Sequence, residues 1–239
     1  MEAIVLAGGK GTRLQGIVKD TPKPMALVQG VPFLTHIIKQ LEANQIYDIV
    51  ISIGYLGNKI KDYFGNNFNG VNISYSSEEY PLLTGGAIKR AISFTSDDYI
   101  FVLNGDTFVG SIDFKLLLEF SKTHKADLAL GLVFQKDCSR FGKIEVDSSG
   151  RVINFGEKKC SGEGLINSGV YCIKRDIFEG SEDIFSFEKF ISDNLKKINI
   201  FGTRFDGDFI DIGVPEDYYR AQHYDFNIKN ILKYRNHKN

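Results

Sequence analysis

The feature that most constrains the fold is an alternation of short strand-like runs with amphipathic segments along the first half of the chain. Four apolar runs rich in β-branched residues are predicted strands, at residues 3–7, 48–53, 71–75 and 98–103. Four helices are predicted at residues 33–44, 56–64, 84–94 and 113–124, with Thr84 and Asp113 as N-cap residues. Because such alternation forms βα units around a mostly parallel sheet, we expect an α/β fold.

The second half contains strands joined by polar turns. Strands are predicted at residues 126–134, 141–146, 152–155, 165–173 and 199–203, with a hairpin turn at residues 147–150. Helices are predicted at residues 187–195 and from Pro215 towards Leu232. With 239 residues, 43% hydrophobic content and no linker or repeat, residues 1–239 are expected to form a single domain.

Charge and cysteine content exclude several classes of protein. A formal net charge of −1 lacks the basic excess of a nucleic-acid-binding protein. Cys138, Cys160 and Cys172 form no C-x-x-C pair, so neither a disulfide framework nor a zinc site is indicated. No apolar run is long enough to span a bilayer and no signal-peptide pattern is present, so we expect a cytoplasmic protein with no membrane partner.

A glycine-rich segment, Leu-Ala-Gly-Gly-Lys-Gly-Thr-Arg-Leu at residues 6–14, follows the first predicted strand directly. Glycines let a backbone approach an anion closely and direct its N–H groups inward. The dinucleotide pattern fails because Leu14 replaces its third glycine, and the P-loop pattern fails because Gly11 follows Lys10. Lys23 adds a second cation, carried on a backbone stiffened by flanking prolines.

Carboxylates stand at two places where a strand is expected to end. Asp106 follows the apolar run of residues 99–103, which would place it at the carboxyl edge of the sheet, although Asn-Gly-Asp could equally form a tight turn. Asp208 and Asp211 are three positions apart, so an extended chain directs them to opposite faces. Only one of the two can therefore join Asp106 at a shared ligand.

Taken together, residues 6–14 and the Pro-Lys-Pro of residues 22–24 resemble the signature of the sugar-nucleotide pyrophosphorylase superfamily, whose members are sugar-1-phosphate nucleotidyltransferases. The resemblance extends over nearly the whole chain. It departs at Gly16, where many members have proline. It implies a three-layer Rossmann-like domain with a mostly parallel mixed central sheet, the GT-A-like nucleotidyltransferase fold. It also implies a Mg²⁺ cofactor, a nucleotide-binding half (about 1–125), a sugar-binding half (about 126–215) and a C-terminal helix and tail (about 215–239).

Site residues follow from this resemblance position by position. Implied catalytic cations are Arg13, Lys23 and Lys158, and implied metal ligands are Asp106 and Asp211, the latter from a stretch similar to D-x-G-x-P-x-D-Y. Implied nucleotide-binding residues are Leu6, Ala7, Gly8, Gly9, Gly11, Thr12 and Gly85, and Glu78 and Glu79, just upstream of Gly85, are further candidates from their carboxylate chemistry. Implied sugar-binding residues are Gly142, Glu157 and Asn167. By composition alone, residues 157–159 would be a solvated charge run and Asp208 a solvated turn residue.

Within the superfamily, the chain most resembles the D-glycero-α-D-manno-heptose 1-phosphate guanylyltransferases, through residues 18–25 (V-K-D-T-P-K-P-M) and residues 82–87 (L-L-T-G-G-A). Much of the superfamily has L-G-T-A-G-A at the latter site. Glu78 or Glu79 could accept from the N1–H and 2-amino donors of guanine, which favours GTP.

Other functions remain open. A mannose-1-phosphate guanylyltransferase, a cytidylyl-, thymidylyl- or uridylyltransferase, a glycosyltransferase and a non-catalytic binding module are the alternatives. The four histidines show no metal-ligand spacing, and His36 is expected to pack on a helix. Tyr218, Tyr219 and Tyr224 could serve a homodimer contact or pack on the C-terminal helix.

Overall fold

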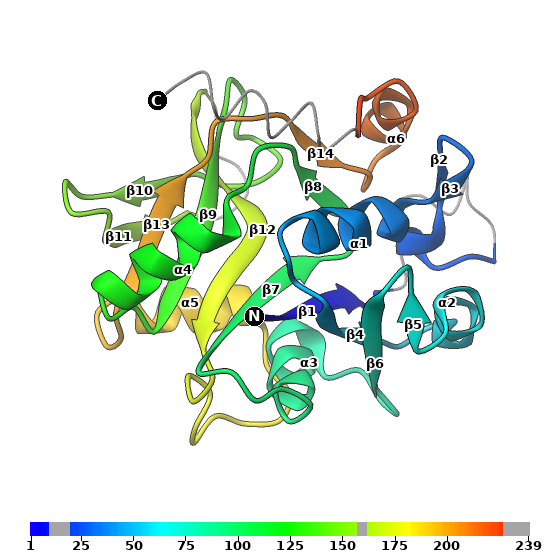
Figure 1. Ribbon diagram of the computed structural model, residues 1–239. Helices are drawn as coiled ribbons and strands as arrows, with labels where there is room; N and C mark the ends of the chain where they lie inside the picture. Colours follow the sequence, from blue (N-terminus) through cyan, green and yellow to red (C-terminus); the bar gives the residue numbers. More distant parts are fainter. Residues whose placement is uncertain (10–19, 157–161, 227–239) are drawn as a thin grey trace.

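The computed structural model describes residues 1–9, 20–156 and 162–226 (Figure 1). Within them, ten strands form one mixed sheet: β1 (Glu2–Ala7), β4 (Asp48–Ile53), β5 (Asn67–Phe68), β6 (Val71–Ser77), β7 (Tyr99–Asn104), β9 (Leu128–Gln135), β10 (Ile144–Val146), β11 (Val152–Phe155), β12 (Gly164–Lys174) and β13 (Ile200–Arg204). Two short ribbons pair β2 (Leu27–Val28) with β3 (Val31–Pro32), and β8 (Thr107–Val109) with β14 (Phe209–Asp211).

The centre of the main sheet is parallel. Its strand order is β11-β10-β12-β7-β1-β4-β6-β5, and β7, β1, β4 and β6 run in the same direction. The chain winds outward from β1 through β4 to β6 and then returns to place β7 on the other side of β1. This reversal leaves a crevice at the carboxyl ends of β1 and β7, where ligands of open α/β sheets bind.

Helices cover both faces of this sheet and form two separate cores. One face packs against α1 (Phe33–Ala43), α2 (Gly57–Phe64) and α4 (Phe114–Thr123), and the other against α3 (Leu83–Ile92) and α5 (Phe187–Asn194), as Figure 1 shows. Along β1, Ala3 and Val5 face the first core and Ile4 faces the second, the two-residue period of a strand buried on both sides. The expected three-layer α/β architecture is confirmed.

The second half extends the sheet with antiparallel strands. Strand β12 pairs antiparallel with β7 on one side and with β9 on the other. The predicted hairpin turn between β10 and β11 is confirmed, because Gly150 has a φ of +83° and Asp147 Oδ1 accepts from the N–H groups of Ser149 and Arg151.

Several local predictions differ from the structure. Leu82, not Thr84, is the N-cap of α3, and the Thr84 hydroxyl accepts from Phe187 N–H instead, whereas Asp113 caps α4 as expected by accepting from Leu116 N–H. The helix at Pro215 is short: α6 (Pro215–Ala221) ends well before Leu232, which lies outside the described residues.

The strand expected from residue 141 begins at Ile144, because the N–H groups of Phe141 and Gly142 both bond to Cys138 C=O in a turn. None of the helices in the described part of the chain has the length and apolar content that a membrane span requires.

Candidate active site

A cavity of about 790 Å³ opens at the carboxyl ends of β1, β4 and β6. It is called here the glycine-loop cavity. Six of the predicted nucleotide-binding residues line it: Leu6, Ala7, Gly8, Gly9, Glu78 and Glu79. Part of its remaining wall is apolar and is formed by Tyr55, Tyr80, Pro81, Leu83 and Ala87. The strand ends and the start of α3 thus create the concave, partly apolar surface typical of small-molecule sites.

Glu78 and the end of β4 approach Gly8 closely, so a side chain there would displace the Glu78 carboxylate. A Cβ at Gly8 would lie 3.0 Å from Glu78 Oε1 and 3.4 Å from the Gly54 nitrogen. The other carboxylate oxygen of Glu78 accepts from Leu82 N–H at 3.2 Å, so this half-buried side chain is anchored beside the glycine loop. Glu79 is exposed at the same rim. The structure therefore distinguishes two glutamates that are equivalent in the sequence.

Gly85 takes a different position from the one expected. It is buried, and a Cβ there would lie 2.2 Å from the Phe185 ring, while Gly85 N–H donates to Phe185 C=O at 2.9 Å. Within the described residues it does not line the glycine-loop cavity, whose wall at this point is formed by Leu83, Thr84 and Ala87. The absence of a side chain at Gly85 lets α3 pack against the segment before α5. The expectation was that it would let a nucleobase approach.

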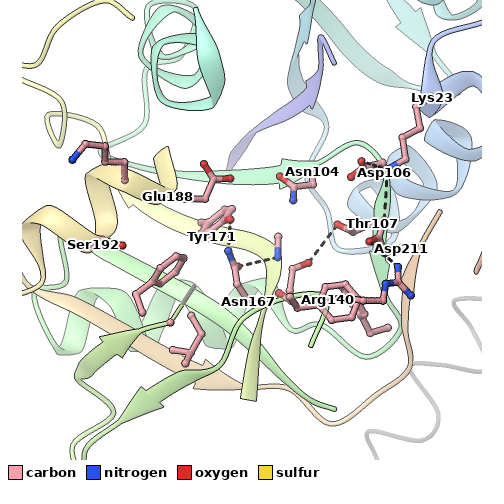
Figure 2. Close-up of a pocket in the computed structure, with 18 of the residues that line it drawn as sticks. Lys23, Asn104, Asp106, Thr107, Arg140, Asn167, Tyr171, Glu188, Ser192 and Asp211 are labelled. Carbon is pink, nitrogen blue, oxygen red and sulfur yellow. Dashed lines mark hydrogen bonds and ion pairs between the residues drawn. The ribbon is translucent and has the colours of Figure 1, made fainter. Parts of the chain in front are cut away.

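A second cavity of about 790 Å³, the β12 cavity, lies over the second half (Figure 2). Asn167 lines it, at a point where the β12 register shifts between Asn167 and Tyr171. The Asn167 side chain is held at both ends, because Oδ1 accepts from Gly169 N–H at 3.0 Å and Nδ2 donates to Tyr171 Oη at 2.7 Å. Gly169, at φ +76°, allows this bulge beside Asn104.

The predicted metal ligands converge from two distant segments. Asp106 follows β7 and Gly105, whose N–H donates to Leu6 C=O and ties the turn to the end of β1. Asp211 is the last residue of β14 and is paired with Thr107 in the β8–β14 ribbon. Because Thr107 directly follows Asp106 in the chain, this pairing brings the two aspartates close together. Lys23 contacts Asp106 and lies 3.6 Å from Asp211 Oδ1, as the dashed lines of Figure 2 indicate.

Burial and charge repulsion affect Asp211. Its pKa is raised, first by burial and then by the neighbouring Asp106 charge, against the opposing effects of Lys23, Gly213 N–H and Arg140. Two neighbouring carboxylates in a half-buried site repel each other and are stabilised by a nearby cation, which is Lys23 in the structure.

Arg140 is a site residue that the sequence analysis missed. It lines the β12 cavity, lies 3.7 Å from Asp211 Oδ2 and donates to Asp217 Oδ2 at 2.7 Å. Asp217 is buried on α6 and also pairs with Arg220. Gly142, a predicted sugar-binding residue, lies in the same turn at φ +81°, where its neighbours Arg140 and Phe141 form the cavity wall. Arg140 had no motif or periodicity to indicate it.

The two cavities share one stretch of wall. Lys23, Asn104, Asp106 and Glu188 line both of them, so three charged side chains lie where the cavities meet. Gly11, Thr12, Arg13, Glu157 and Lys158 lie outside the described residues. Gly9 and Gly156, which precede those two segments, line the glycine-loop and β12 cavities respectively.

Comparison with known proteins identifies the family of the chain. Residues 2–227 match the family model for nucleotidyl transferases. The chain belongs to this family. Among relatives of the nucleotidyl transferase, D-glycero-α-D-manno-heptose 1-phosphate guanylyltransferase from Campylobacter jejuni is 43% identical over 221 residues, covering 92% of this chain and 97% of the relative. The enzyme of the same description from Aneurinibacillus thermoaerophilus is 41% identical over 225 residues, covering 93% and 97%.

Solved structures show the same nucleotidyl transferase fold. The crystal structure of HddC from Yersinia pseudotuberculosis complexed with GMP-PN has a TM-score of 0.82 and 36% identity, covering 93% of this chain and 98% of that chain. A putative glucose-1-phosphate thymidylyltransferase from Bacillus anthracis, at 22% identity and a TM-score of 0.83, supports the fold alone. The expected superfamily and fold are confirmed.

The metal expected in a nucleotidyl transferase fits the residues present. Within the described residues, no group of three or more His, Cys, Asp or Glu side chains could hold a metal ion by itself. Asp106 and Asp211 are instead two carboxylates that both approach Lys23, and Mg²⁺ is commonly held by one or two carboxylates together with substrate phosphates. The raised pKa of Asp211 and the position of Lys23 are both consistent with a site that attracts a cation.

Proposed function

We propose that the chain transfers a guanylyl group from GTP to D-glycero-α-D-manno-heptose 1-phosphate, giving a GDP-sugar and pyrophosphate. The carrying observation is the wall shared by the two cavities, where Lys23 and Asp106 face both. With the nucleotide in the glycine-loop cavity and the sugar in the β12 cavity, the phosphates of the two substrates meet at this wall. The Campylobacter and Aneurinibacillus relatives, described by that activity, support the choice of substrates.

The reaction needs little proton chemistry. An oxygen of the sugar 1-phosphate forms a bond to the α-phosphorus of the triphosphate, and the bond from that phosphorus to the bridging oxygen breaks, so pyrophosphate leaves with the electron pair. Because the nucleophile is already anionic, no general base is required. The main barrier is repulsion between anions, which Lys23 at the shared wall lowers, and we assign the same role to Arg13 and Lys158. A magnesium ion bound by Asp106 and Asp211 would neutralise further charge on the phosphates.

We assign guanine recognition to Glu78 rather than Glu79. Glu78 is half-buried and held by Leu82 N–H beside Gly8, so its carboxylate has a defined position when a base arrives. The N1–H and 2-amino groups of guanine are neighbouring donors that a carboxylate can accept together. Glu79 is exposed and hydrated, so we expect it to contribute little discrimination.

We assign sugar binding to Asn167, Gly142 and Glu157, and the binding of the sugar phosphate to Lys158 with support from Arg140. The continuous sheet favours one catalytic domain over residues 1–239, with both halves contributing to one site. Cys138 and Cys172 are buried thiols, which suits the reducing cytoplasm.

A pyrophosphate-release assay tests the proposal. The full chain is supplied with Mg²⁺ and each combination of GTP, CTP, UTP or dTTP with heptose 1-phosphate, mannose 1-phosphate or glucose 1-phosphate. The highest kcat/KM is expected for GTP with the heptose phosphate. Preference for mannose 1-phosphate or for a pyrimidine triphosphate would replace the substrate assignment. Absence of release with every pair would contradict the catalytic assignment itself.

A further inference from the structure

Leu83 occupies an unfavourable backbone conformation at the wall of the glycine-loop cavity. Its φ is +62°, in the left-handed region that glycine adopts readily and that is unfavourable for a residue with a side chain. Its side chain is 54% exposed, so the core does not compensate for this cost. A glycine at this position would form the same start of α3 with less strain.

The other non-glycine residues with positive φ in the described part of the chain differ from Leu83 in polarity or exposure. Asp20, Gln29, Gln45, Asn69 and Lys125 are polar residues, and the remaining aliphatic one, Leu56, is less exposed and lies at the start of α2. Among these positions, Leu83 alone combines an aliphatic side chain, more than half exposed, with a place on a cavity wall. Strain retained without burial is typical of functional sites.

The surroundings of Leu83 indicate what it contacts. Tyr80 and Tyr55 line the same cavity and are 54% and 46% exposed, and Pro81 and Ala87 add further apolar surface. The bare backbone of Gly8 and Gly9 forms another part of the wall. An apolar enclosure beside a fixed carboxylate, that of Glu78, suits a flat heterocycle whose faces are apolar and whose edge carries hydrogen-bond donors.

We propose that the Leu83 side chain is an apolar contact for the nucleobase, and that its left-handed backbone holds the side chain in the cavity. The inference rests on the proposed function, because it requires a nucleoside triphosphate in the glycine-loop cavity. It assigns to Leu83 part of the binding energy for the base, and it gives a physical reason for retaining the strained conformation. Glu78 then reads the edge of the base while Leu83 covers its surface.

The decisive variant is Leu83→Gly, because strain and contact predict opposite effects on stability and binding. Removing the side chain relieves the backbone, so the midpoint of thermal unfolding is expected to rise. GTP is expected to bind about five- to tenfold more weakly, measured by calorimetry with Mg²⁺ and no sugar phosphate, since partial loss of one leucine contact is of this order. The KM for heptose 1-phosphate is expected to stay within about twofold. Leu83→Ala keeps the left-handed residue and should weaken GTP binding without the gain in stability.

Gln45→Gly is the matched control, since Gln45 has the same φ of +62° and is exposed outside both cavities. It should stabilise the chain and leave GTP binding unchanged. Wild-type GTP affinity in both Leu83 variants would overturn the inference while leaving the proposed function intact. A wild-type chain that binds no triphosphate would contradict the proposed function instead. Weaker binding in the Leu83 variants with a normal Gln45 variant supports the assignment.

Discussion

Lys23 is the side chain at which the opposing charges of the site meet. It contacts Asp106, approaches Asp211 to 3.6 Å, and lines both cavities. An ammonium group there stabilises two carboxylates. Under the proposed function it would also reach the phosphate oxygens of a bound substrate. Because Lys23 is largely buried, its charge is screened less than that of a surface lysine. Loss of this cation would remove the described ion-pair partner of Asp106 and, among the described side chains, would leave Asp211 paired with Arg140 alone.

Asp106→Asn and Asp211→Asn are each expected to lower kcat by about two orders of magnitude or more. Each change removes a charged oxygen ligand from the proposed Mg²⁺ site between two polyanions. Steady-state pyrophosphate release at saturating Mg²⁺ measures the effect, and thermal unfolding verifies that the variants fold. Asp208→Asn, three residues earlier and exposed, is the control and should retain activity. Near-normal turnover in both site variants would disprove the metal assignment.

Glu78→Gln is expected to lower kcat/KM for GTP by about 5- to 150-fold, equivalent to about 1–3 kcal/mol for an unsatisfied polar group. The amide presents a donor where guanine also presents donors, so the loss should be specific to GTP. Glu79→Gln is the adjacent comparison, and it should change kcat/KM by less than about twofold. An equal loss in both variants would remove the distinction drawn from the Leu82 hydrogen bond.

At the scale of elements, the contact between α3 and the segment preceding α5 depends on missing side chains. Cβ atoms at Gly85 and Gly86 would lie 2.2 Å from the Phe185 ring and 2.1 Å from Asp183 C=O. Gly85→Ala should therefore lower the free energy of unfolding by about 1–3 kcal/mol through overpacking, as urea denaturation would measure. Adding Phe185→Leu should recover part of the loss. If Gly85→Ala destabilised the wild-type chain and the Phe185→Leu chain equally, overpacking against Phe185 would not be the cause.

His36 of α1 is buried and packs against the C-terminal segment, in agreement with the packing role expected for it. The His36 ring stacks on Phe226 at 4.0 Å between centroids, and its Nε2 pairs with Val28 C=O at 3.2 Å. Burial lowers the pKa of His36 below its ordinary value of about 6.5. The unfolded chain therefore takes up this proton first as the pH falls.

This histidine is expected to contribute stability that is complete above about pH 6.5 and is lost as the pH falls towards its folded pKa. The free energy of unfolding should fall between pH 7 and pH 5, and it should fall less in His36→Gln. Urea denaturation at both pH values measures the difference. His223→Gln, an exposed position, controls for general effects of removing a histidine. An unchanged pH dependence in the His36 variant would contradict the expectation.

Elements with strong local signals could be predicted from the sequence, and elements defined by distant pairing could not. The β-branched runs of β1 and β4 and the Asp113 cap are local features, and the structure has each of them. The β8–β14 ribbon has three-residue strands with no measurable period, and it is what brings Asp211 beside Asp106. Arg140 pairs with Asp217 across 77 positions, so its place in the site has no local signal.

For the whole molecule, substrate binding should appear as a gain in stability. A ligand that binds only the folded chain adds about 2.7 kcal/mol at 100 times its Kd, which corresponds to about 5–10 °C for a chain of this size. GTP with Mg²⁺ is expected to raise the unfolding midpoint by this amount, and CTP at the same concentration by less. Chelating Mg²⁺ should abolish most of the difference. Equal shifts for the two nucleotides would argue against guanine selection.

The wall shared by the two cavities also governs how the proposed enzyme would respond to its own product. Under the proposed function, a nucleotide sugar would place its nucleotide in the glycine-loop cavity and its sugar in the β12 cavity, and would cover Lys23 and Asp106, which line both cavities. Such a molecule excludes GTP and the sugar phosphate at once. Accumulated product would then compete with either substrate, and flux through the enzyme would follow the rate at which the next step in the cell removes it.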